Sequence, residues 1–588
     1  MSVNRASADE KKKEIGKKET LLRLLGYMAS YRKSAVAVII IMMISSLIVV
    51  ILPFLAEDAV DNRVPAGDMK GLLILTSLYI TLSLIWWGLE RLRVRIMSRV
   101  SNRVVLEVRD EAFAHLQTLG LFYFDSRPTG KILSRLIGDI SSLKQLLQQL
   151  VTILIPNTFF LCAIVAAMFI LNPVLALGAV SSLPVVGLGT FLIMKRNYPV
   201  WFDYRQKQSN VAGFVHEAAA GMKVIQSFCA EGEAKKEFGT INDDVKHHWI
   251  KAVRFGDVIG IVIDVSIGVG YFMMFLLAAF VLETDASGVG ELIAFMTYLS
   301  LFWQPVRTLS NMYNQLTNNL SGAGRVFEIL DEESNLNEES DAVTLPPSKG
   351  EVTFDHVSFA YPDEPERLIL EDVCFSCHPG EKIALVGPTG AGKTTVINLI
   401  ARFYDPVSGR VLIDGHDISH VTFSSLRHSV GVMTQESFLF SGTVRENILY
   451  GNENATEDEM IRACTLVGAH DVIMHLKDGY DTDTGKLTLS QGQRQLIALA
   501  RTLLSDPAIL ILDEATANVD THTELIVQHG IEVLMKNRTT FVVAHRLSTI
   551  RNSDRIFVIR DRGIAEEGSH EELLAADGLY AALVRAQS

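Results

Sequence analysis

The sequence predicts an α-helical transmembrane domain of six spans, followed by an α/β domain built around a glycine-rich loop. Long apolar runs occur only in the first half of the chain, and β-like apolar runs alternate with helical stretches in the second half. The segment GPTGAGKT, residues 387–394, directly follows the apolar strand KIALV. At 588 residues the chain also exceeds the roughly 200 residues of a large single domain, so at least two units are expected.

Six apolar segments are long enough to cross a bilayer, which takes about 20 mostly apolar residues. These segments are residues 35–55, 72–89, 150–171, 174–194, 256–282 and 291–312. The alternative, buried helices of a large soluble core, would need six long runs almost free of charge. We therefore expect a multi-pass membrane domain over residues 1–330.

The placement of Lys and Arg predicts the orientation of these spans. The turn at Asn172–Pro173 and the loop 283–290 carry no Lys or Arg. The basic residues that precede the first span include Lys11, Lys12, Lys13, Lys17, Lys18, Arg23, Arg32 and Lys33. Because positively charged loops stay on the cytoplasmic side, we expect a cell-membrane protein with both termini in the cytoplasm.

Charge and cysteine content exclude some classes of protein. The net charge of -13 argues against nucleic acid as a partner, because binding to phosphate backbones requires basic surfaces. Five scattered cysteines do not form a disulfide framework. Cys374 and Cys377 form a C-x-x-C in a predicted strand, where residues three apart point to opposite faces. This placement favours structural cysteines over a metal or redox motif.

Two polar segments, 90–149 and 195–255, separate pairs of spans and are too charged to lie in the hydrocarbon. They predict long helices that continue into the cytoplasm. Residues 331–350 are acidic and contain Pro, Ser and Gly, which indicates a solvated linker. Residues 351–588 then alternate strand-like and helical stretches, as in an α/β domain.

The glycine-rich segment has the spacing G-x-x-x-x-G-K-[ST] in the strand-then-helix context that a phosphate-binding loop requires. Backbone N–H groups of such a loop surround the phosphates, Lys393 neutralises the β- and γ-phosphates, and the Thr394 hydroxyl binds Mg²⁺. The alternative is a glycine-rich turn that binds nothing. The sequence therefore predicts ATP and Mg²⁺ as ligands, bound by Gly387, Thr389, Gly390, Ala391, Gly392, Lys393, Thr394 and Thr395.

A second apolar strand, AILIL at 508–512, ends in two adjacent acids, Asp513 and Glu514. Ligands meet an open α/β sheet at the carboxyl ends of its strands. Adjacent residues of a strand point in different directions, so Asp513 is expected to hold Mg²⁺ and Glu514 to orient and deprotonate an attacking water.

Taken together, these motifs resemble ATP-binding-cassette exporters of the half-transporter type along nearly the whole chain. The resemblance implies that Tyr361 stacks on adenine, that Gln435 contacts Mg²⁺ and the attacking water, and that His545 contacts the γ-phosphate. It also implies that LSQGQ, with Ser490, Gln491, Gly492 and Gln493, is the signature that faces a partner's nucleotide. Asp520 in ANVD belongs to the loop after the catalytic acid.

The resemblance extends to two cytoplasmic loops of the membrane half, FDSRPTGKILSRLIGD and HEAAAGMKVIQSF. It implies short helices near residues 122–130 and 209–219 that dock on nucleotide-binding domains. The segment 479–488 before the signature is shorter than in the family and lacks its usual glutamate, which puts coupling through that segment in doubt.

The signature departs from the family's LSGGQ at Gln491. In the family two nucleotide domains sandwich two ATP molecules, so a changed signature alters the partner's site. Because this chain keeps Glu514, the pattern resembles the catalytically competent subunit of heterodimeric multidrug exporters. The partner would then carry an intact signature and a degenerate catalytic acid. A homodimer in which Gln491 is harmless is the alternative.

The substrate is nearly unspecified, and drugs, lipids and peptides all remain open. Asp264 lies in the middle of an apolar segment, so it is either a counter-charge for cationic substrates or a hydrogen-bonded acid in the protein interior. Gln304 and Pro305 either line a cavity or mark a simple kink. An ATP-gated channel is a second functional hypothesis, and a soluble ATPase module is disfavoured by the spans.

Overall fold

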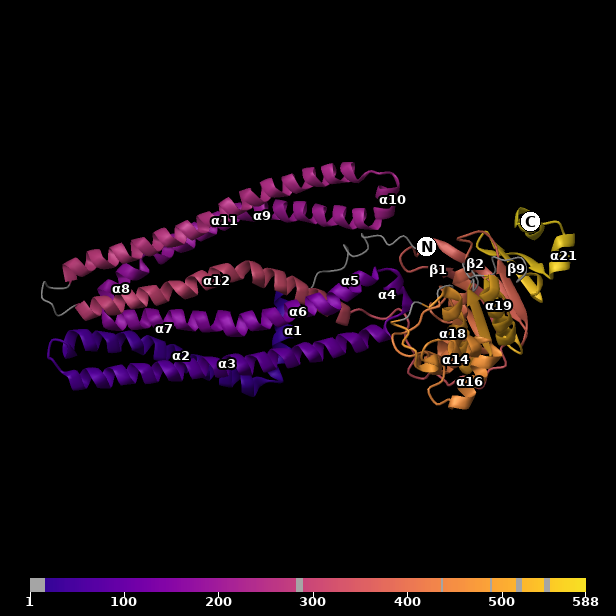
Figure 1. Ribbon diagram of the computed structural model, residues 1–588, viewed down its shortest axis with the longest axis horizontal. Helices are drawn as coiled ribbons and strands as arrows, with labels where there is room; N and C mark the ends of the chain where they lie inside the picture. The colour runs from indigo at the N-terminus through magenta and orange to yellow at the C-terminus, as the bar shows by residue number, and fades with distance from the viewer. Residues whose placement is uncertain are drawn as a thin grey trace. The chain divides into compact units, whose positions relative to one another are not determined.

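The computed structural model describes residues 16–281, 289–434, 437–486, 489–513, 521–543 and 550–587. These residues form two compact units, which Figure 1 colours in chain order. The helical unit holds the described residues up to Leu116 together with Gly130–Asp331. The second unit combines Gln117–Thr129 with the chain from Glu332 onward. A segment from the first predicted cytoplasmic loop therefore belongs to the same compact unit as the α/β fold.

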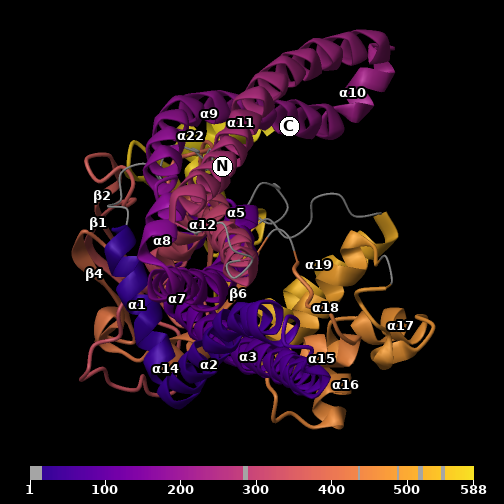
Figure 2. The same ribbon diagram turned by 90° about the vertical axis from the view of Figure 1, so that its left-hand side faces the viewer.

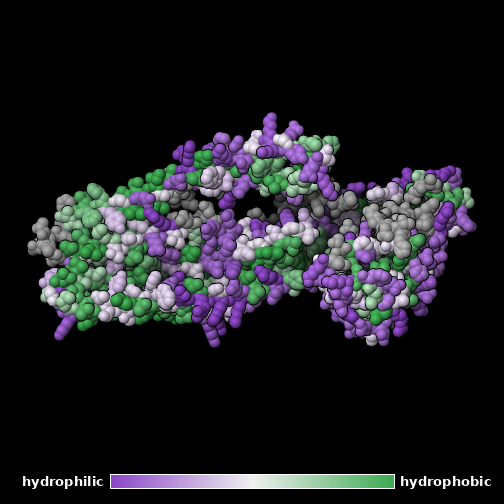
Figure 3. All heavy atoms as spheres, viewed as in Figure 1, coloured by the Kyte–Doolittle hydropathy of each residue, from purple (hydrophilic) through white to green (hydrophobic). Residues whose placement is uncertain are grey.

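The helical unit consists of long helices joined by short turns. Its elements are α1 (Lys17–Ala29), α2 (Arg32–Asp58), η1 (Ala59–Arg63), α3 (Met69–Thr118), α5 (Thr129–Ser134), η2 (Arg135–Asp139), α6 (Ile140–Gln148), η3 (Gln149–Leu154), α7 (Ile155–Leu171), α8 (Pro173–Val180), α9 (Leu183–Ala220), α10 (Met222–Ser227), α11 (Glu231–Val281) and α12 (Val289–Leu330). Helices α9 and α11 lie side by side in both ribbon views (Figures 1 and 2). In Figure 3 hydrophobic residues gather over the part of this unit where α2 ends and α3 begins.

Four helical stretches among the described residues are long and apolar enough to cross a membrane: Arg32–Arg63, Met69–Thr118, Thr129–Leu171 and Gly260–Ala279. They contain the expected spans 35–55, 72–89 and 150–171 and most of 256–282. The expected spans 174–194 and 291–312 are also largely helical, in α8, α9 and α12, but they are not among these four. The count of six spans therefore stays a prediction.

Short polar side chains accept hydrogen bonds from the first-turn N–H groups of α8 and α12. The Asn172 Oδ1 accepts hydrogen bonds from the N–H groups of Val174 and Leu175 at 3.0 and 3.2 Å, and Pro173 occupies the first helical position of α8. The Asp61 carboxylate accepts from Gly290 and Glu291 at 2.6 and 3.1 Å at the start of α12. Asp61 therefore connects η1 to a helix more than two hundred residues away in the chain.

One expectation for this unit needs correction. The helical stretch expected over 209–219 is the end of α9, and the short helix between the two long arms is α10, Met222–Ser227. Gly221 lies between the two helices, as the C-cap residue of α9 and the N-cap residue of α10. Helix α12 continues through Pro305 to Leu330, so the two expectations for Pro305, a cavity lining and a kink, stay predictions.

The described residues of the second unit form two sheets. The six-stranded sheet has the order β10-β9-β3-β8-β7-β6, with β3 (Lys382–Val386), β6 (Val430–Met433), β7 (Ile509–Asp513), β8 (Thr539–Val543), β9 (Arg555–Arg560) and β10 (Gly563–Gly568). All its neighbouring pairs are parallel except β9–β10. The four-stranded antiparallel sheet has the order β2-β1-β4-β5, with β1 (Val352–Ala360), β2 (Leu368–Cys377), β4 (Ser408–Ile413) and β5 (His416–Asp417).

Strands β3, β7 and β8 are buried along almost their whole length, as expected of parallel strands that are covered on both faces. The helices described in this unit are α4 (Leu121–Asp125), α13 (Lys393–Ile400), η5 (Ile418–His420), α14 (Phe423–Ser429), α15 (Val444–Leu449), α16 (Glu457–Leu466), α17 (Ala469–Met474), η6 (Gly479–Asp481), α18 (Gln491–Leu504), α19 (Thr521–Met535), α21 (His570–Ala575) and α22 (Leu579–Gln587). On β2, Cys374 is exposed and Cys377 is buried, as the alternation of a strand predicts.

The linker is held on the α/β unit by hydrogen bonds rather than being merely solvated. Val343 pairs with Val421, and the Glu338 carboxylate accepts from the Phe423 N–H at 2.8 Å. Arg402 is 2% exposed and donates to the carbonyls of Val421 and Asn337 at 3.1 and 3.3 Å. Its guanidinium therefore connects the linker to the segment before α14.

Candidate nucleotide-binding site

The phosphate loop lies where the sequence predicts it, between the buried strand β3 and the helix α13. Gly387 has a φ of +146°, and a Cβ there would lie 2.3 Å from the Ile559 carbonyl oxygen. Gly390 has a φ of +83° with open space around it. Only glycine fits the first position without displacing backbone, so the loop depends on Gly387 for its shape.

Lys393 is the first residue of α13, directly after the glycines of this loop. Its side chain is largely buried, and its Nζ donates to the carbonyls of Gly387 and Pro388 at 2.9 and 3.0 Å. Thr389, Gly390 and Thr394 are exposed, so this part of the loop is accessible to a ligand. A positive charge beside open N–H groups at a helix N-terminus is an arrangement that binds phosphate.

The carboxyl ends of β3, β8, β7 and β6 meet at one edge of the sheet, because these strands are parallel and adjacent in that order. Asp513 ends β7 opposite Val543, the last residue of β8. Four predicted residues, Gln435, Glu514, Asp520 and His545, lie outside the described residues. Three of them follow these strands: Gln435 comes after β6, Glu514 after β7 and His545 after β8. The topology thus directs the chain from each strand toward the edge that holds the phosphate loop.

Tyr361 approaches the same loop from β1. Its hydroxyl lies 3.2 Å from the Thr395 Oγ1, which links it to the first turn of α13. Its ring meets those of Phe359 and Tyr404 edge-on, with centroids 5.0 and 5.4 Å apart. The predicted adenine-stacking residue therefore lies beside the phosphate loop and is packed into an aromatic cluster.

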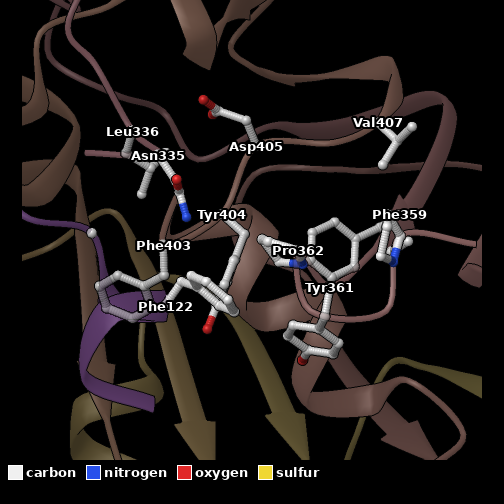
Figure 4. Close-up of a pocket in the computed structure, with 13 residues that line it drawn as sticks. Phe122, Asn335, Leu336, Phe359, Tyr361, Pro362, Phe403, Tyr404, Asp405 and Val407 are labelled. Atoms are coloured by element: carbon white, nitrogen blue, oxygen red, sulfur yellow. The ribbon is translucent and has the colours of Figure 1, made fainter. Parts of the chain in front are cut away.

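A cavity of about 250 Å³ lies next to this cluster. Figure 4 shows Phe122 and Phe403 on one side of it, Phe359, Tyr361 and Pro362 on the other, and Tyr404 between them. Tyr404 donates from its hydroxyl to the Asp125 Oδ2 at 2.8 Å, and Leu121 and Phe122 pack on the sheet core. Burial and this hydrogen bond raise the pKa of Tyr404. Helix α4 is therefore fixed to the unit that holds the phosphate loop.

The signature begins the helix α18. Ser490 and Gln493 form a reciprocal cap, in which the Ser490 Oγ accepts from the Gln493 N–H at 3.2 Å and the Gln493 Oε1 accepts from the Ser490 N–H at 2.9 Å. Gln491 occupies the first helical position, is partly exposed, and is not among the described non-glycine residues with positive φ. The backbone at this position therefore does not require glycine, although the side chain of Gln491 occupies space that glycine would leave open.

The segment before the signature, residues 479–488, is also held in place at Thr484. The Thr484 hydroxyl donates to the Phe440 and Gly442 carbonyls at 2.8 and 2.9 Å.

In the membrane half, Asp264 of α11 accepts a hydrogen bond from Arg307 of α12. Sequence reasoning singled out Asp264 but missed Arg307, and it also missed Tyr404. The signal for Arg307 was its place inside an apolar run, which is as costly for an arginine as for an aspartate. Asp264 is thus hydrogen-bonded to a neighbouring helix, as one of its two expected roles requires, and a role as counter-charge for cationic substrates stays a prediction.

The fold and the site define a class: a P-loop nucleotide-binding domain in one chain with long apolar helices. Comparisons with known proteins agree. Residues 35–306 match the ABC transporter transmembrane region, and residues 370–517 match the ABC transporter domain. The chain belongs to the ABC transporter family, as an exporter half-transporter with an ATPase coupled to transport.

Named relatives extend over most of the chain. It is 35% identical to an ATP-dependent lipid A-core flippase of Syntrophus aciditrophicus (strain SB), over 90% of this chain and 88% of that protein. It is also 35% identical to a putative multidrug export ATP-binding/permease protein of Staphylococcus aureus (strain NCTC 8325 / PS 47), over 96% of this chain and 99% of that one. A solved bacterial Atm1-family ABC exporter with ATP bound has a TM-score of 0.79 and 28% identity, and the match covers 95% of this chain and 99% of that one.

Proposed function

We propose that this chain is one half of a dimeric exporter that uses ATP to move hydrophobic or amphipathic compounds of drug, lipid or peptide type out of the cell. The observation that carries this proposal is that the phosphate loop and Asp513 lie at the same edge of one sheet. In the same unit, Tyr404 holds α4 by its hydrogen bond to Asp125. The relatives above, a lipid flippase and a putative multidrug exporter, support an amphipathic substrate. The proposed domains are 1–330, 331–350 and 351–588, in the cell membrane with both termini in the cytoplasm.

Each residue at the strand edge has a proposed role in ATP hydrolysis. Lys393 and the loop N–H groups hold the phosphates, Tyr361 stacks on adenine, Glu514 deprotonates the attacking water, and His545 contacts the γ-phosphate. Thr394, Asp513 and Gln435 would hold Mg²⁺. The exposed hydroxyl of Thr394 and the carboxylate of Asp513 are hard oxygen donors of the kind that this ion prefers. Bound Mg²⁺ neutralises phosphate charge.

The variants Glu514→Gln and Lys393→Ala test these roles. Lys349→Ala is the control, because it removes an exposed lysine that lies outside the phosphate loop. Glu514→Gln should lose ATP turnover and keep ATP binding, since the phosphate ligands remain. Lys393→Ala should lose ATP affinity itself. Measured in the complete dimer, near wild-type hydrolysis by Glu514→Gln, or tight ATP binding by Lys393→Ala, would refute the assignment.

We further propose that the second half-transporter is a different chain, with an intact LSGGQ and a degenerate catalytic acid. Gln491 would then be confined to the site that this chain completes on its partner, while Lys393 and Glu514 meet an unaltered signature. The second candidate is a homodimeric lipid or drug flippase, and the ordinary backbone conformation of Gln491 favours it. An ATP-gated channel would use the same ATP site without stoichiometric pumping.

A further inference from the structure

Asp264 and Arg307 are the two charged residues that lie away from the ends of the six apolar segments; Asp257 and Glu291 lie at segment ends. In the structure these two residues bond to each other, from α11 to α12. The side chain of Arg307 is 51% exposed and that of Asp264 is 67% exposed. The two isolated charges of the predicted membrane segments therefore form one accessible ion pair.

Exposing an ion pair inside an apolar segment to the hydrocarbon of the membrane is energetically costly. Charged side chains inside membranes face the protein interior or a water-filled cavity. Among the described residues the pair is only partly covered, so its open side belongs to a surface that water, a substrate or the second subunit reaches. In an exporter, water and the substrate occupy the transport path.

We propose that Asp264 and Arg307 form the headgroup site for zwitterionic amphiphiles in the transport path, an inference that rests on the proposed function. A guanidinium binds phosphate or carboxylate through two parallel N–H bonds, and a carboxylate accepts from an ammonium group. A headgroup with both charges, such as phosphoethanolamine, replaces both sides of the protein pair. A ligand with one charge leaves the opposite protein charge unpaired, and that is costly away from bulk water.

The surroundings of the pair fit an amphiphile. Ile261 and Val265 flank Asp264 on α11 and are 60% and 58% exposed, so apolar surface for an acyl chain adjoins the charges. On α12, Gln304 is exposed one turn before Arg307. The exposed side-chain amide of Gln304 is therefore a further polar group beside the headgroup.

The test measures ligand affinity directly, with the full-length chain in an uncharged maltoside detergent so that the added amphiphile supplies the only headgroup charge. Titration calorimetry compares short-chain phosphatidylethanolamine, short-chain phosphatidylglycerol and a trimethylammonium amphiphile of equal chain length. Wild-type protein should bind the zwitterionic ligand about tenfold more tightly than either singly charged one, a difference of about 1.4 kcal/mol.

Neutral variants should change the order of preference rather than only weaken binding. Asp264→Asn leaves Arg307 and should favour the anionic ligand, whereas Arg307→Gln leaves Asp264 and should favour the cationic one. The double variant should bind all three with similar affinity. Arg325→Gln is the matched control, because it also removes an arginine of α12 from an ion pair, with Asp139, but outside the apolar segments.

An unchanged order of preference in both single variants overturns the inference, as does equal wild-type affinity for the three ligands. These results are distinguishable from a failure of the proposed function. That failure appears as no difference in ATP hydrolysis between wild-type protein and Glu514→Gln in its active dimer, whatever the amphiphile affinities are.

Discussion

The Tyr404 hydroxyl donates to the Asp125 carboxylate at 2.8 Å, although 279 residues separate the two in the chain. Asp125 is the last residue of α4, and the ring of Tyr404 packs edge-on against Tyr361 with centroids 5.4 Å apart. One tyrosine therefore contacts both a helix from the membrane half's first cytoplasmic loop and the residue proposed to stack on adenine.

Tyr404→Phe should reduce transport per ATP hydrolysed while leaving ATP affinity near that of wild type. The change keeps the ring and removes a hydrogen bond to a carboxylate, which is worth about 2 kcal/mol. Transport and hydrolysis are measured together in proteoliposomes. Tyr450→Phe, the same change at an exposed tyrosine, is the control. Equal transport-to-ATP ratios in Tyr404→Phe and wild type would contradict this role.

Gly387→Ala should lower the melting temperature more than Gly390→Ala, measured without nucleotide. Both residues have positive φ, which costs an alanine about 1–3 kcal/mol of strain. Only at Gly387 would the new Cβ also collide with backbone, at the Ile559 carbonyl oxygen. Similar melting temperatures for the two variants would show that the close approach at Gly387 relaxes at no cost.

Arg402→Met should destabilise the α/β unit by about 3 kcal/mol, because it leaves the Val421 and Asn337 carbonyls without their buried donor. The guanidinium also lies 4.7 Å from the centre of the Phe423 ring, a contact that methionine replaces only in part. Denaturant unfolding gives the free energy. The control Arg367→Met breaks an exposed pair with Glu364 and should change stability by less than about 0.5 kcal/mol. A loss at Arg402 as small as the control's would be inconsistent with this account.

Maleimide labelling of folded protein at pH 7 should modify Cys374 and spare Cys377 and Cys464. Cys374 is exposed, whereas the other two are buried. Burial raises the pKa of Cys377, and it raises the pKa of Cys464 to about 11, so the reactive thiolate of each is scarce at neutral pH. Raising the pH to 9 should leave Cys464 slow, because that pH is still below its pKa. Mass spectrometry locates the label, and denatured protein, in which all three should react, is the control. Fast labelling of Cys377 before unfolding would show that β2 opens.

Much of the nucleotide unit could be predicted because its signals are local. The strand KIALV is contiguous with the loop after it, Asp513 directly ends the apolar strand that precedes it, and the structure forms both strands and the helix after the loop. The cysteines of β2 likewise follow the alternation of a strand. These features depend on backbone geometry within a few residues.

Contacts between distant segments could not be predicted in the same way. Nothing near Asp264 in the sequence indicates Arg307, and nothing near Asp125 indicates Tyr404, because each pair forms only when separate helices or units pack. The short helix α10 was misplaced although Gly221, a common residue at helix ends, offered a local signal for the end of α9. The roles of Glu514, His545, Gln435 and Asp520 stay predictions.

The central claim is that this chain's Lys393 and Glu514 need a signature that its own Gln491 does not supply. ATP hydrolysis by the chain purified alone in lipid nanodiscs tests it most directly, with Gln491→Gly as the comparison and Glu514→Gln as the blank. The account predicts turnover at the level of the blank for wild-type protein and a clear gain for Gln491→Gly. Brisk wild-type turnover that Gln491→Gly does not increase would contradict it, and would identify a homodimer in which glutamine serves in the signature.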